Sequence, residues 1–299
     1  MTRPTWGGRV TYTPGMSSTA HPQPQVFDDS HHAATLLRKV GRALQLGPKY
    51  YLWDLPRYFA HRRRRRLPLW DPAALTNPLR EFRPTCPAPE ALPPGYGEAL
   101  ARFAEAGLIL TIPRPRLENL LRIWWETRIA AGDVIECGAY RGGTSLFLAL
   151  LGRLNGIDQK VLLMDTFAGM PPVSVYDLGR TDGEFTPPSD QVDVIRRQAE
   201  ALAIAERIEI HRGLFNETFP ALAARDARFA FVHIDANIYE GTLEACRFAI
   251  PRVSPSGAVV FDDYNGVCDL GARLAIDEFF AGRGIKPQPL TASSAWVRF

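Results

Sequence analysis

Three aspartates stand directly after two apolar segments, where their carboxylates could hold a divalent cation. Asp235 follows the run Phe229–Ile234, and Asp262 and Asp263 follow the run at 258–261. Continuous apolar runs are typical of parallel strands covered on both faces, and the carboxyl ends of neighbouring parallel strands meet at one crevice. Three oxygen ligands without a set of Cys or His suit a hard ion, so the sequence predicts an Mg²⁺ site. The alternative is that two of these aspartates only cap loops.

A glycine-rich segment, ECGAYRGGTS at 136–145, lies where an apolar strand is predicted to turn into an apolar helix. Gly138 permits a turn with positive φ, and Gly142 and Gly143 let the backbone approach a ligand. The free amides at the helix start suit a carboxylate or phosphate. The spacing differs from the G-x-G-x-x-G of dinucleotide sites, and Glu136 would repel a pyrophosphate but could accept from an ammonium group. These features favour S-adenosylmethionine over NAD, although glycines also serve simple strand-to-helix packing.

Another acid, Asp165, stands where the ribose of a nucleoside is bound in folds of this kind. The apolar run at 160–164 ends in Asp165, which is followed by Thr166 and Phe167. An acid at the end of the second strand, about 20 to 30 residues beyond the glycines, is placed to accept from ribose hydroxyls. The alternative for Asp165 is a helix N-cap or a turn former. Together with the glycine segment, it indicates a nucleoside cofactor.

From about Thr111 to the C-terminus, several blocks follow one another in a specific order. They are RLENLLRIWW, GDVIECGAYRGGTS, DTFAGMPP, DGEF, RGLFNETFP, HIDANIYEGTLEA, FDDYNG and GARLAIDEF. This ordered set resembles the macrocin O-methyltransferase-like (TylF-type) family. Its members are Mg²⁺- and S-adenosylmethionine-dependent O-methyltransferases of sugar hydroxyls in natural products.

The resemblance implies an α/β fold of the class I methyltransferase type, doubly wound around a mostly parallel seven-stranded sheet, with an N-terminal helical or irregular extension. The alternation of predicted strands and helices indicates the same architecture. The three aspartates would bind the metal, and Asp235 would also be the general base. The residues predicted to form the cofactor site are Glu136, Gly138, Ala139, Tyr140, Thr144, Ser145, Asp165, Thr166, Phe167, Gly213 and Asp235.

Two departures from related patterns bear on the acceptor and on the base. Asn237 stands where the family usually carries an acid, two residues after Asp235. Catechol-type Mg²⁺ methyltransferases commonly place a lysine just after that aspartate, and its absence here favours a sugar or alcohol hydroxyl. His233 could share a strand face with Asp235 and act as a base if it faced the crevice. The favoured interpretation is a strand histidine hydrogen-bonded in the core.

The chain divides into three predicted parts. Residues 1–30 are rich in Pro, Thr, Ser and Gly and are predicted to be disordered or draped over the surface. Residues 31–110 form a helical or irregular lid or acceptor-recognition region, with a helix at about 97–106. Residues 111–299 form the S-adenosylmethionine-binding domain, which begins with a helix at about 116–131 and closes with two short strands.

Charge and composition limit the classes of binding partner that the chain is expected to have. The net charge is +3, but residues 1–100 hold 14 Lys or Arg against 7 Asp or Glu. Five consecutive arginines begin at Arg62 and end at Arg66, and such a run could attract nucleic acid, an anionic membrane or a phosphorylated substrate. The favoured interpretation is a solvated run, and the acidic sites argue against nucleic acid. Without a long apolar run or a signal-peptide core, the expected location is the cytoplasm. The scattered cysteines suggest neither disulfides nor a zinc site.

The leading hypothesis is an S-adenosylmethionine- and Mg²⁺-dependent O-methyltransferase acting on a hydroxyl of a sugar or glycosylated natural product. The ion would gather the acceptor hydroxyl, and a base would remove its proton as the oxygen attacks the methyl group. The resemblance also implies a homo-oligomer. The alternatives are a nicotinamide-dependent oxidoreductase, which lacks its glycine motif here, a non-catalytic binding or scaffold protein, and a methyltransferase of a catechol-like or other non-sugar hydroxyl.

Overall fold

The structure is a computed structural model that describes residues 26–27, 50–67, 91–266, 268–291 and 293–299. Within these residues, seven strands form one sheet in the order β3-β2-β1-β4-β5-β7-β6. β7 runs antiparallel to β5 and β6, and the other neighbouring pairs are parallel. The strands are β1 Asp133–Cys137, β2 Val161–Asp165, β3 Ile208–Arg212, β4 Phe229–Ile234, β5 Val253–Phe261, β6 Gln288–Pro289 and β7 Ala295–Arg298. The predicted doubly wound, mostly parallel sheet is confirmed.

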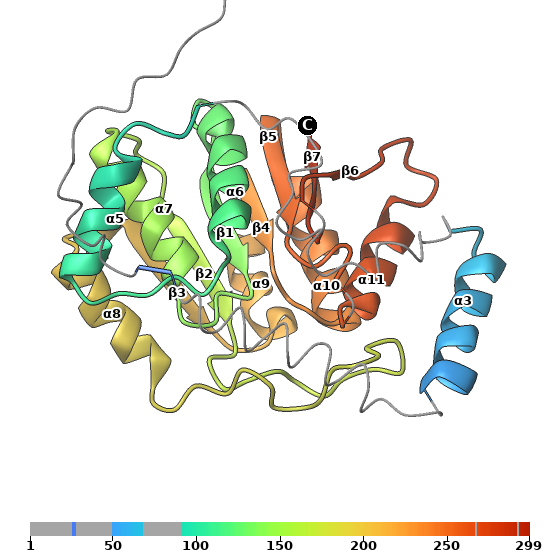
Figure 1. The fold of residues 1–299 in the computed structure, drawn as a ribbon. Coiled ribbons are helices and arrows are strands. Elements are labelled where there is room, and N and C mark those ends of the chain that lie inside the picture. The colour runs from blue at the N-terminus through green and yellow to red at the C-terminus, as the bar shows by residue number, and fades with distance from the viewer. Residues whose placement is uncertain (1–25, 28–49, 68–90, 267, 292) are drawn as a thin grey trace, which may run out of the picture.

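Helices cover both faces of the sheet (Figure 1). The helices are η1 Tyr50–Asp54 (a π-helix), α3 Leu55–Arg64, α5 Tyr96–Glu105, α6 Arg114–Thr127, α7 Gly143–Leu154, α8 Gln191–Ala201, η3 Ala205–Arg207, α9 Phe215–Ala224, α10 Tyr239–Ala249, η4 Ile250–Arg252 and α11 Leu270–Phe280. Helices α5 to α8 share one apolar core with one face of the sheet, and α9 to α11 share a second core with the other face. This three-layer arrangement explains why the central strands are apolar throughout.

The central strands are buried as the sequence predicts. All six residues of β4 are buried, and so are the last five of β5. β5 begins earlier than the predicted run at 258–261, because Val253 already pairs with Phe229 before the register shifts. The register then places Ile234 beside Phe261, so the residues that follow the two strands emerge next to each other.

The helices that precede β1 are close to their predicted positions. In α6, Leu117, Leu121 and Trp124 form the predicted buried stripe, and the helix begins at Arg114 because Pro115 fits its first turn. Phe103 of α5 packs against Phe147 of α7 with ring centroids 4.9 Å apart. Helix α5 therefore shares its core with the sheet, although it precedes the proposed domain boundary at residue 111.

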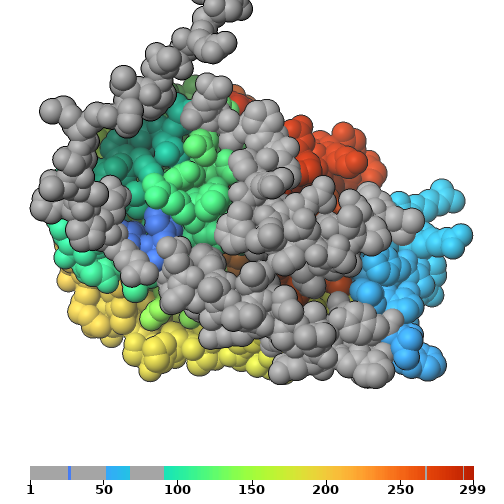
Figure 2. Space-filling view, in the orientation of Figure 1, coloured from blue at the N-terminus to red at the C-terminus, as the bar shows by residue number. Residues whose placement is uncertain are grey.

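The extension before α5 is described only in two pieces. Val26 is buried, and Phe27 forms an isolated parallel bridge with Leu110 beside α6. The rest of the predicted N-terminal tail lies outside the described residues, as do residues 31–49 and 68–90 of the predicted lid or acceptor-recognition region. Helix α3 lies at one edge of the molecule beside α11, and the space-filling view shows it as a light blue patch next to the red C-terminal region (Figure 2).

One arginine of the run at 62–66 is buried, which corrects the expectation of a uniformly solvated run. Arg62 has no exposed surface and pairs with Asp277 of α11. The hydroxyl of Tyr58, one turn earlier, donates to the carbonyl of Leu270 at 2.8 Å. Residues 63–66 are exposed. Helix α3 carries Tyr58 and Arg62 on one face because they are four residues apart, and this face binds α11.

No helix among the described residues is long and apolar enough to cross a membrane. Cys137, Cys246 and Cys268 are buried free thiols. Cys137 packs in the core beneath the glycine segment, as a small apolar residue would.

Candidate active site

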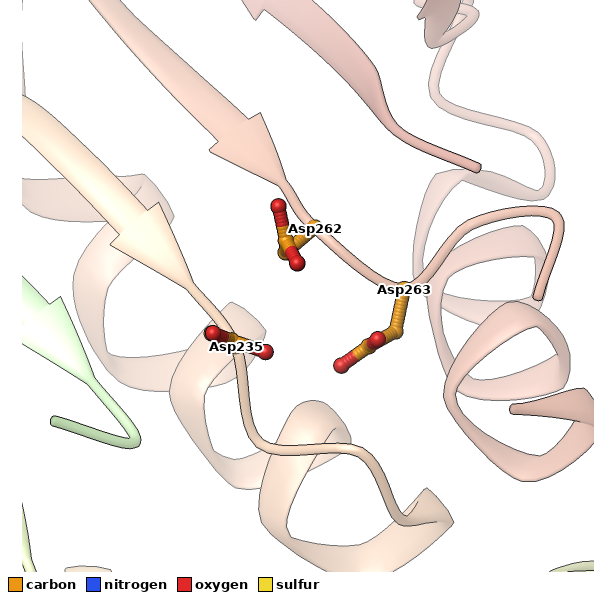
Figure 3. A group of neighbouring side chains, drawn as sticks. All are labelled: Asp235, Asp262 and Asp263. Atoms are coloured by element: carbon orange, nitrogen blue, oxygen red, sulfur yellow. The ribbon is translucent and has the colours of Figure 1, made fainter. Parts of the chain in front are cut away.

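The three predicted metal ligands converge at the ends of β4 and β5 (Figure 3). One carboxylate oxygen from each of Asp235, Asp262 and Asp263 lies within 4.8 Å of the others. Asp262 and Asp263 are buried, and Asp235 is partly exposed. The side chains point toward a common centre, which is the arrangement that an oxygen-binding cation requires.

Asn237 links two of these aspartates. Its side-chain amide donates to Asp235 Oδ1 at 3.1 Å and also to Asp263, and its backbone N–H donates to Asp263 Oδ2 at 3.1 Å. Asn237 has a φ of +60°, a conformation that asparagine tolerates better than most residues. A neutral donor thus occupies the position where the family usually has an acid, and it holds the two carboxylates without adding charge.

The three carboxylates differ in acidity because their neighbours differ. Burial, with the charges of Asp262 and Asp263, raises the pKa of Asp235 well above its usual value. Burial and the nearby acids Asp269 and Asp262 raise the pKa of Asp263 to about 6. Burial opposes ionisation of Asp262 as well, but the charges of Arg116 and His233 lower its pKa to about 2. Asp262 is therefore the permanently ionised member.

His233 connects the metal-type site with the glycine segment behind the cavity. Its Nδ1 lies 2.9 Å from Glu136 Oε1, and its Nε2 lies 3.9 Å from Asp262 Oδ1. Ser145 donates its hydroxyl to the other oxygen of Glu136. Burial opposes a charged imidazole, but the neighbouring carboxylates of Asp262 and Glu136 raise the pKa of His233 to about 10. His233 is fully buried, as the favoured interpretation of a core histidine expects.

The glycine segment adopts the predicted strand-to-helix turn. Gly138 has a φ of +99°, and a Cβ there would lie 2.0 Å from the carbonyl oxygen of Asp235. Gly142 directly precedes α7 and has a φ of +77°, and a Cβ on this residue would lie 2.9 Å from the side chain of Ile195. Glycine at 138 therefore lets the loop after β1 lie directly against the loop after β4, and Asp235 depends on this contact for its position.

Asp165 lies at the end of β2, as predicted, and fixes the loops around it. Its Oδ2 accepts from the backbone N–H of Tyr140 at 2.8 Å, and its Oδ1 accepts from that of Phe167 at 2.7 Å. Burial raises its pKa despite these two hydrogen bonds. Each oxygen keeps further acceptor capacity, so the carboxylate can also bind hydroxyl groups.

One cavity of about 420 Å³ joins the glycine segment, Asp165 and the three aspartates. The predicted site residues that line it are Glu136, Gly138, Ala139, Tyr140, Thr144, Asp165, Thr166, Gly213, Asp235, Asp262 and Asp263. Two predicted cofactor residues, Ser145 and Phe167, lie behind the wall instead. Ser145 holds Glu136, and Phe167 packs in the core while its amide holds Asp165.

Sequence reasoning missed several residues that line the cavity. Arg116 of α6 pairs with Asp262 from across the site. The long loop between β2 and α8 supplies Arg180, which binds Asp269, and Phe185, whose ring lies 5.5 Å from that of Tyr140. The available signal was that these residues belong to, or lie next to, the blocks RLENLLRIWW and DGEF.

The loop between β2 and α8 is tied to the start of α10 through Asp177. The side chain of Asp177 accepts from the backbone N–H of Tyr239, at the start of α10, at 2.6 Å. The same carboxylate also accepts from the backbone N–H of Ser174 at 2.7 Å, within the loop itself. The bond to α10 fixes the loop beside the ends of the strands, where its residues Arg180 and Phe185 line the cavity.

Known proteins that are similar to this chain are O-methyltransferases. Residues 110–297 match the model of the family described as macrocin O-methyltransferase (TylF). A Streptomyces olivaceus protein, 8-demethyl-8-(2,3-dimethoxy-α-L-rhamnosyl)-tetracenomycin-C 4′-O-methyltransferase, is 33% identical over 182 residues, which cover 54% of this chain and 67% of that protein. Mycinamicin III 3″-O-methyltransferase of Micromonospora griseorubida is 28% identical over 166 residues, covering 52% and 63% respectively.

Solved structures share the fold. The calicheamicin methyltransferase CalS11 aligns with a TM-score of 0.58 at 18% identity, covering 79% of this chain and 96% of that one. The O-methyltransferase NovP aligns with a TM-score of 0.54 at 23% identity, covering 61% and 78%. The family match extends over more than half of the chain and includes every predicted cofactor and metal residue. The protein therefore belongs to the macrocin O-methyltransferase family.

Proposed function

We propose that this protein transfers the methyl group of S-adenosylmethionine to a hydroxyl of a sugar in a glycosylated natural product, with Mg²⁺ at Asp235, Asp262 and Asp263. The observation that carries the proposal is the single cavity that contains both the glycine segment with Asp165 and the three carboxylates. A methyl donor and an acceptor hydroxyl bound in one cavity are held close together, which is the main requirement of a methyl transfer.

The cofactor would bind along the carboxyl ends of β1 and β2. Asp165 would accept from the ribose hydroxyls, and Glu136 would accept from the ammonium group. Glu136 lines the cavity although its oxygens also bind Ser145 and His233, so its orientation is fixed before the ligand arrives. Gly138 lets the loop after β1 pack directly against the backbone of Asp235, so the cofactor segment and the carboxylates border one another.

The residues present fit a hard divalent cation. Three carboxylates converge, and Asp262 Oδ1 is a buried oxygen that accepts no hydrogen bond from the described residues. Mg²⁺ at these oxygens would lower the pKa of an acceptor hydroxyl and neutralise the clustered negative charge. His233 lies behind Asp262 and Asn237 lies beside Asp235, so both would orient the ligands from outside the site.

Asp235 is the proposed general base. It lines the cavity, and it is the one carboxylate of the three that is partly exposed, so it can reach the hydroxyl of a bound acceptor. His233 is the alternative base that the sequence left open. It is fully buried, does not belong to the cavity wall, and has its Nδ1 bound to Glu136. We therefore assign it a supporting role.

The acceptor class follows from the relatives. The Streptomyces olivaceus and Micromonospora griseorubida proteins are named for methylation of glycosylated natural products, and the acceptor of this protein would carry a sugar of that kind. No lysine follows Asp235, which argues against a catechol. The extension at 31–110 would contribute to acceptor recognition, the domain at 111–299 would carry the chemistry, and the protein would assemble as a homo-oligomer.

The first test is calorimetric titration of S-adenosylmethionine and S-adenosylhomocysteine into the purified protein, with Mg²⁺ or with EDTA. We expect micromolar binding to the wild type and a loss of at least about tenfold in Asp165→Ala, because a charged hydrogen-bond partner of the ribose is removed. Asp158→Ala serves as the matched control, since Asp158 is exposed and lies outside this cavity. Absence of binding to the wild type would contradict the proposal.

The second test is turnover. Methyl transfer to a panel of glycosylated natural products should depend on Mg²⁺, and catechols should be poor acceptors. Cofactor binding without turnover on any acceptor, with or without Mg²⁺, would instead favour a non-catalytic binding protein.

A further inference from the structure

The cavity is strongly acidic, which creates a problem for one part of the proposed cofactor. Eight acidic side chains line it: Glu136, Asp165, Asp235, Glu240, Glu244, Asp262, Asp263 and Asp269. Among the described lining residues, Arg116 and Arg180 are the only cationic side chains. The amino-acid end of S-adenosylmethionine carries a carboxylate, and burying it among acids without a cation would be costly. Besides the backbone amides at the start of α7, these two arginines are the groups among the described lining residues that could neutralise it.

Arg180 is committed elsewhere. Its guanidinium binds Asp269 through two nitrogens, and a third nitrogen lies 3.2 Å from Glu184. The same guanidinium lies over the ring of Phe185 at 5.4 Å. These partners belong to the loop between β2 and α8 and to the residue before α11, so Arg180 holds that loop in place.

Arg116 lies at the end of the cavity where the amino-acid group of the cofactor is expected. The chain segment that leads into α6 packs closely on the start of α7. A Cβ on Gly143 would lie 3.2 Å from the carbonyl oxygen of Ile109. Arg116 pairs with Asp262, whose other oxygen lies 3.9 Å from His233, which in turn binds Glu136. Arg116 and Glu136 are thus separated only by this short buried chain.

We propose that Arg116 binds the carboxylate of S-adenosylmethionine opposite Glu136, and that a cation at Asp262 releases Arg116 for this role. The inference rests on the proposed function, since it names the partner of that same cofactor. In the structure Arg116 neutralises Asp262 at the position where the metal ligand faces the cavity. Mg²⁺ at Asp262 would replace this neutralising charge and repel the guanidinium, which would then favour a carboxylate nearby.

The arrangement makes cofactor and metal binding cooperative. If Mg²⁺ favours the position of Arg116 that binds the carboxylate, then the carboxylate must favour Mg²⁺ by the same factor. The coupling needs both the carboxylate and Arg116. It should therefore disappear when either is removed.

The test compares S-adenosylmethionine with decarboxylated S-adenosylmethionine, which keeps the ammonium group and the sulfonium but lacks the carboxylate. Dissociation constants are measured by calorimetry for the wild type, Arg116→Gln and Arg180→Gln, with Mg²⁺ and with EDTA. In the presence of Mg²⁺, Arg116→Gln should weaken S-adenosylmethionine by about 10- to 100-fold and change the decarboxylated ligand by less than about threefold. Arg180→Gln should change both ligands by the same factor.

Two further comparisons complete the test. Mg²⁺ should tighten binding of S-adenosylmethionine to the wild type by about fivefold or more, and this effect should vanish for the decarboxylated ligand and in Arg116→Gln. If Arg116→Gln does not fold, Arg116→Lys keeps the charge but loses the paired donors and should show a smaller selective loss. Equal weakening of both ligands by the Arg116 variants, or no weakening, would overturn the assignment. No binding of either ligand to the wild type would instead overturn the proposed function.

Discussion

Replacement of Gly138 by alanine should disturb the site through the backbone alone. Gly138 has a φ of +99°, and the added Cβ would lie 2.0 Å from the carbonyl oxygen and 2.6 Å from the carbonyl carbon of Asp235. Backbone atoms cannot rotate away as a side chain can. The loop after β4, which begins with Asp235, must therefore move relative to the glycine segment.

The expected cost has two parts. A left-handed φ costs a residue with a Cβ about 1–2 kcal/mol, and overpacking of a tight contact adds about 1–3 kcal/mol. The sum for Gly138→Ala is about 2–5 kcal/mol in the free energy of unfolding. Gly107 is the matched control, because its φ is +65° and nothing lies within 4 Å of a Cβ there. Gly107→Ala should therefore show only the first part, about 1–2 kcal/mol.

Denaturant unfolding of the two variants and the wild type separates these parts, and an Mg²⁺ titration adds the functional readout. Gly138→Ala should unfold at lower denaturant than Gly107→Ala and bind Mg²⁺ more weakly, because one ligand is displaced. Gly107→Ala should bind Mg²⁺ as the wild type does. Equal destabilisation of the two variants with unchanged Mg²⁺ affinity would refute the argument that Gly138 positions Asp235.

Three further outcomes are expected. Mg²⁺ affinity should fall as the pH drops through about 6, because the pKa of Asp263 is about 6 and a protonated Asp263 or Asp235 cannot hold the ion. Calorimetric Mg²⁺ titrations between pH 5 and pH 8 measure this dependence. An affinity that does not change with pH would contradict the prediction. Asn237→Asp should shift that fall to higher pH, because an added carboxylate raises the pKa of its neighbours, and the same titration would show any opposite shift. Arg62→Met should lower the free energy of unfolding by about 3–5 kcal/mol, because one partner of a buried ion pair is removed, whereas Arg64→Met, at an exposed position, should leave the denaturation midpoint unchanged. Similar midpoints for the two variants would contradict the argument that Arg62 forms a buried ion pair.

The elements that carry the proposed chemistry could be predicted from sequence because they follow local rules. An acid at the end of a buried parallel strand has nowhere to lie except the shared edge of the sheet, and this rule predicted the places of Asp165, Asp235 and Asp262. A glycine at a strand-to-helix corner implies positive φ, which the +99° of Gly138 confirms. In each case the residue and its few neighbours contain the information.

The residues that sequence reasoning missed depend on packing between distant parts of the chain. Arg116 meets Asp262 only because α6 lies across the end of β5, a contact between residues 146 positions apart. The loop that carries Arg180 and Phe185 has no periodic pattern, so nothing in it predicts that it lines the cavity. Ser145 and Phe167 were assigned to the cavity because their neighbours belong there, although their side chains point into the interior.

The run of arginines at 62–66 gives a second example in which packing with a distant part of the chain could not be predicted from local sequence. Five identical side chains have identical local chemistry, and charge alone predicts that all are solvated. Arg62 differs because it lies four residues after Tyr58, so both share the face of α3 that meets α11. The helical spacing was available in the sequence, but the partner helix lies about 215 residues away along the chain.

The carboxylate of Asp277, which binds Arg62 on α3, also supports the loop that carries part of the proposed metal site. Asp277 binds Arg62 through one oxygen, and its other oxygen accepts from the hydroxyl of Tyr264 at 2.8 Å. Tyr264 directly follows Asp263, so the loop that carries two metal-ligand candidates is held by the same buried acid that receives α3. Arg62, Asp277 and Tyr264 thus form one buried chain of contacts that leads from α3 to the loop carrying Asp263, and Arg273 of α11 binds the same carboxylate.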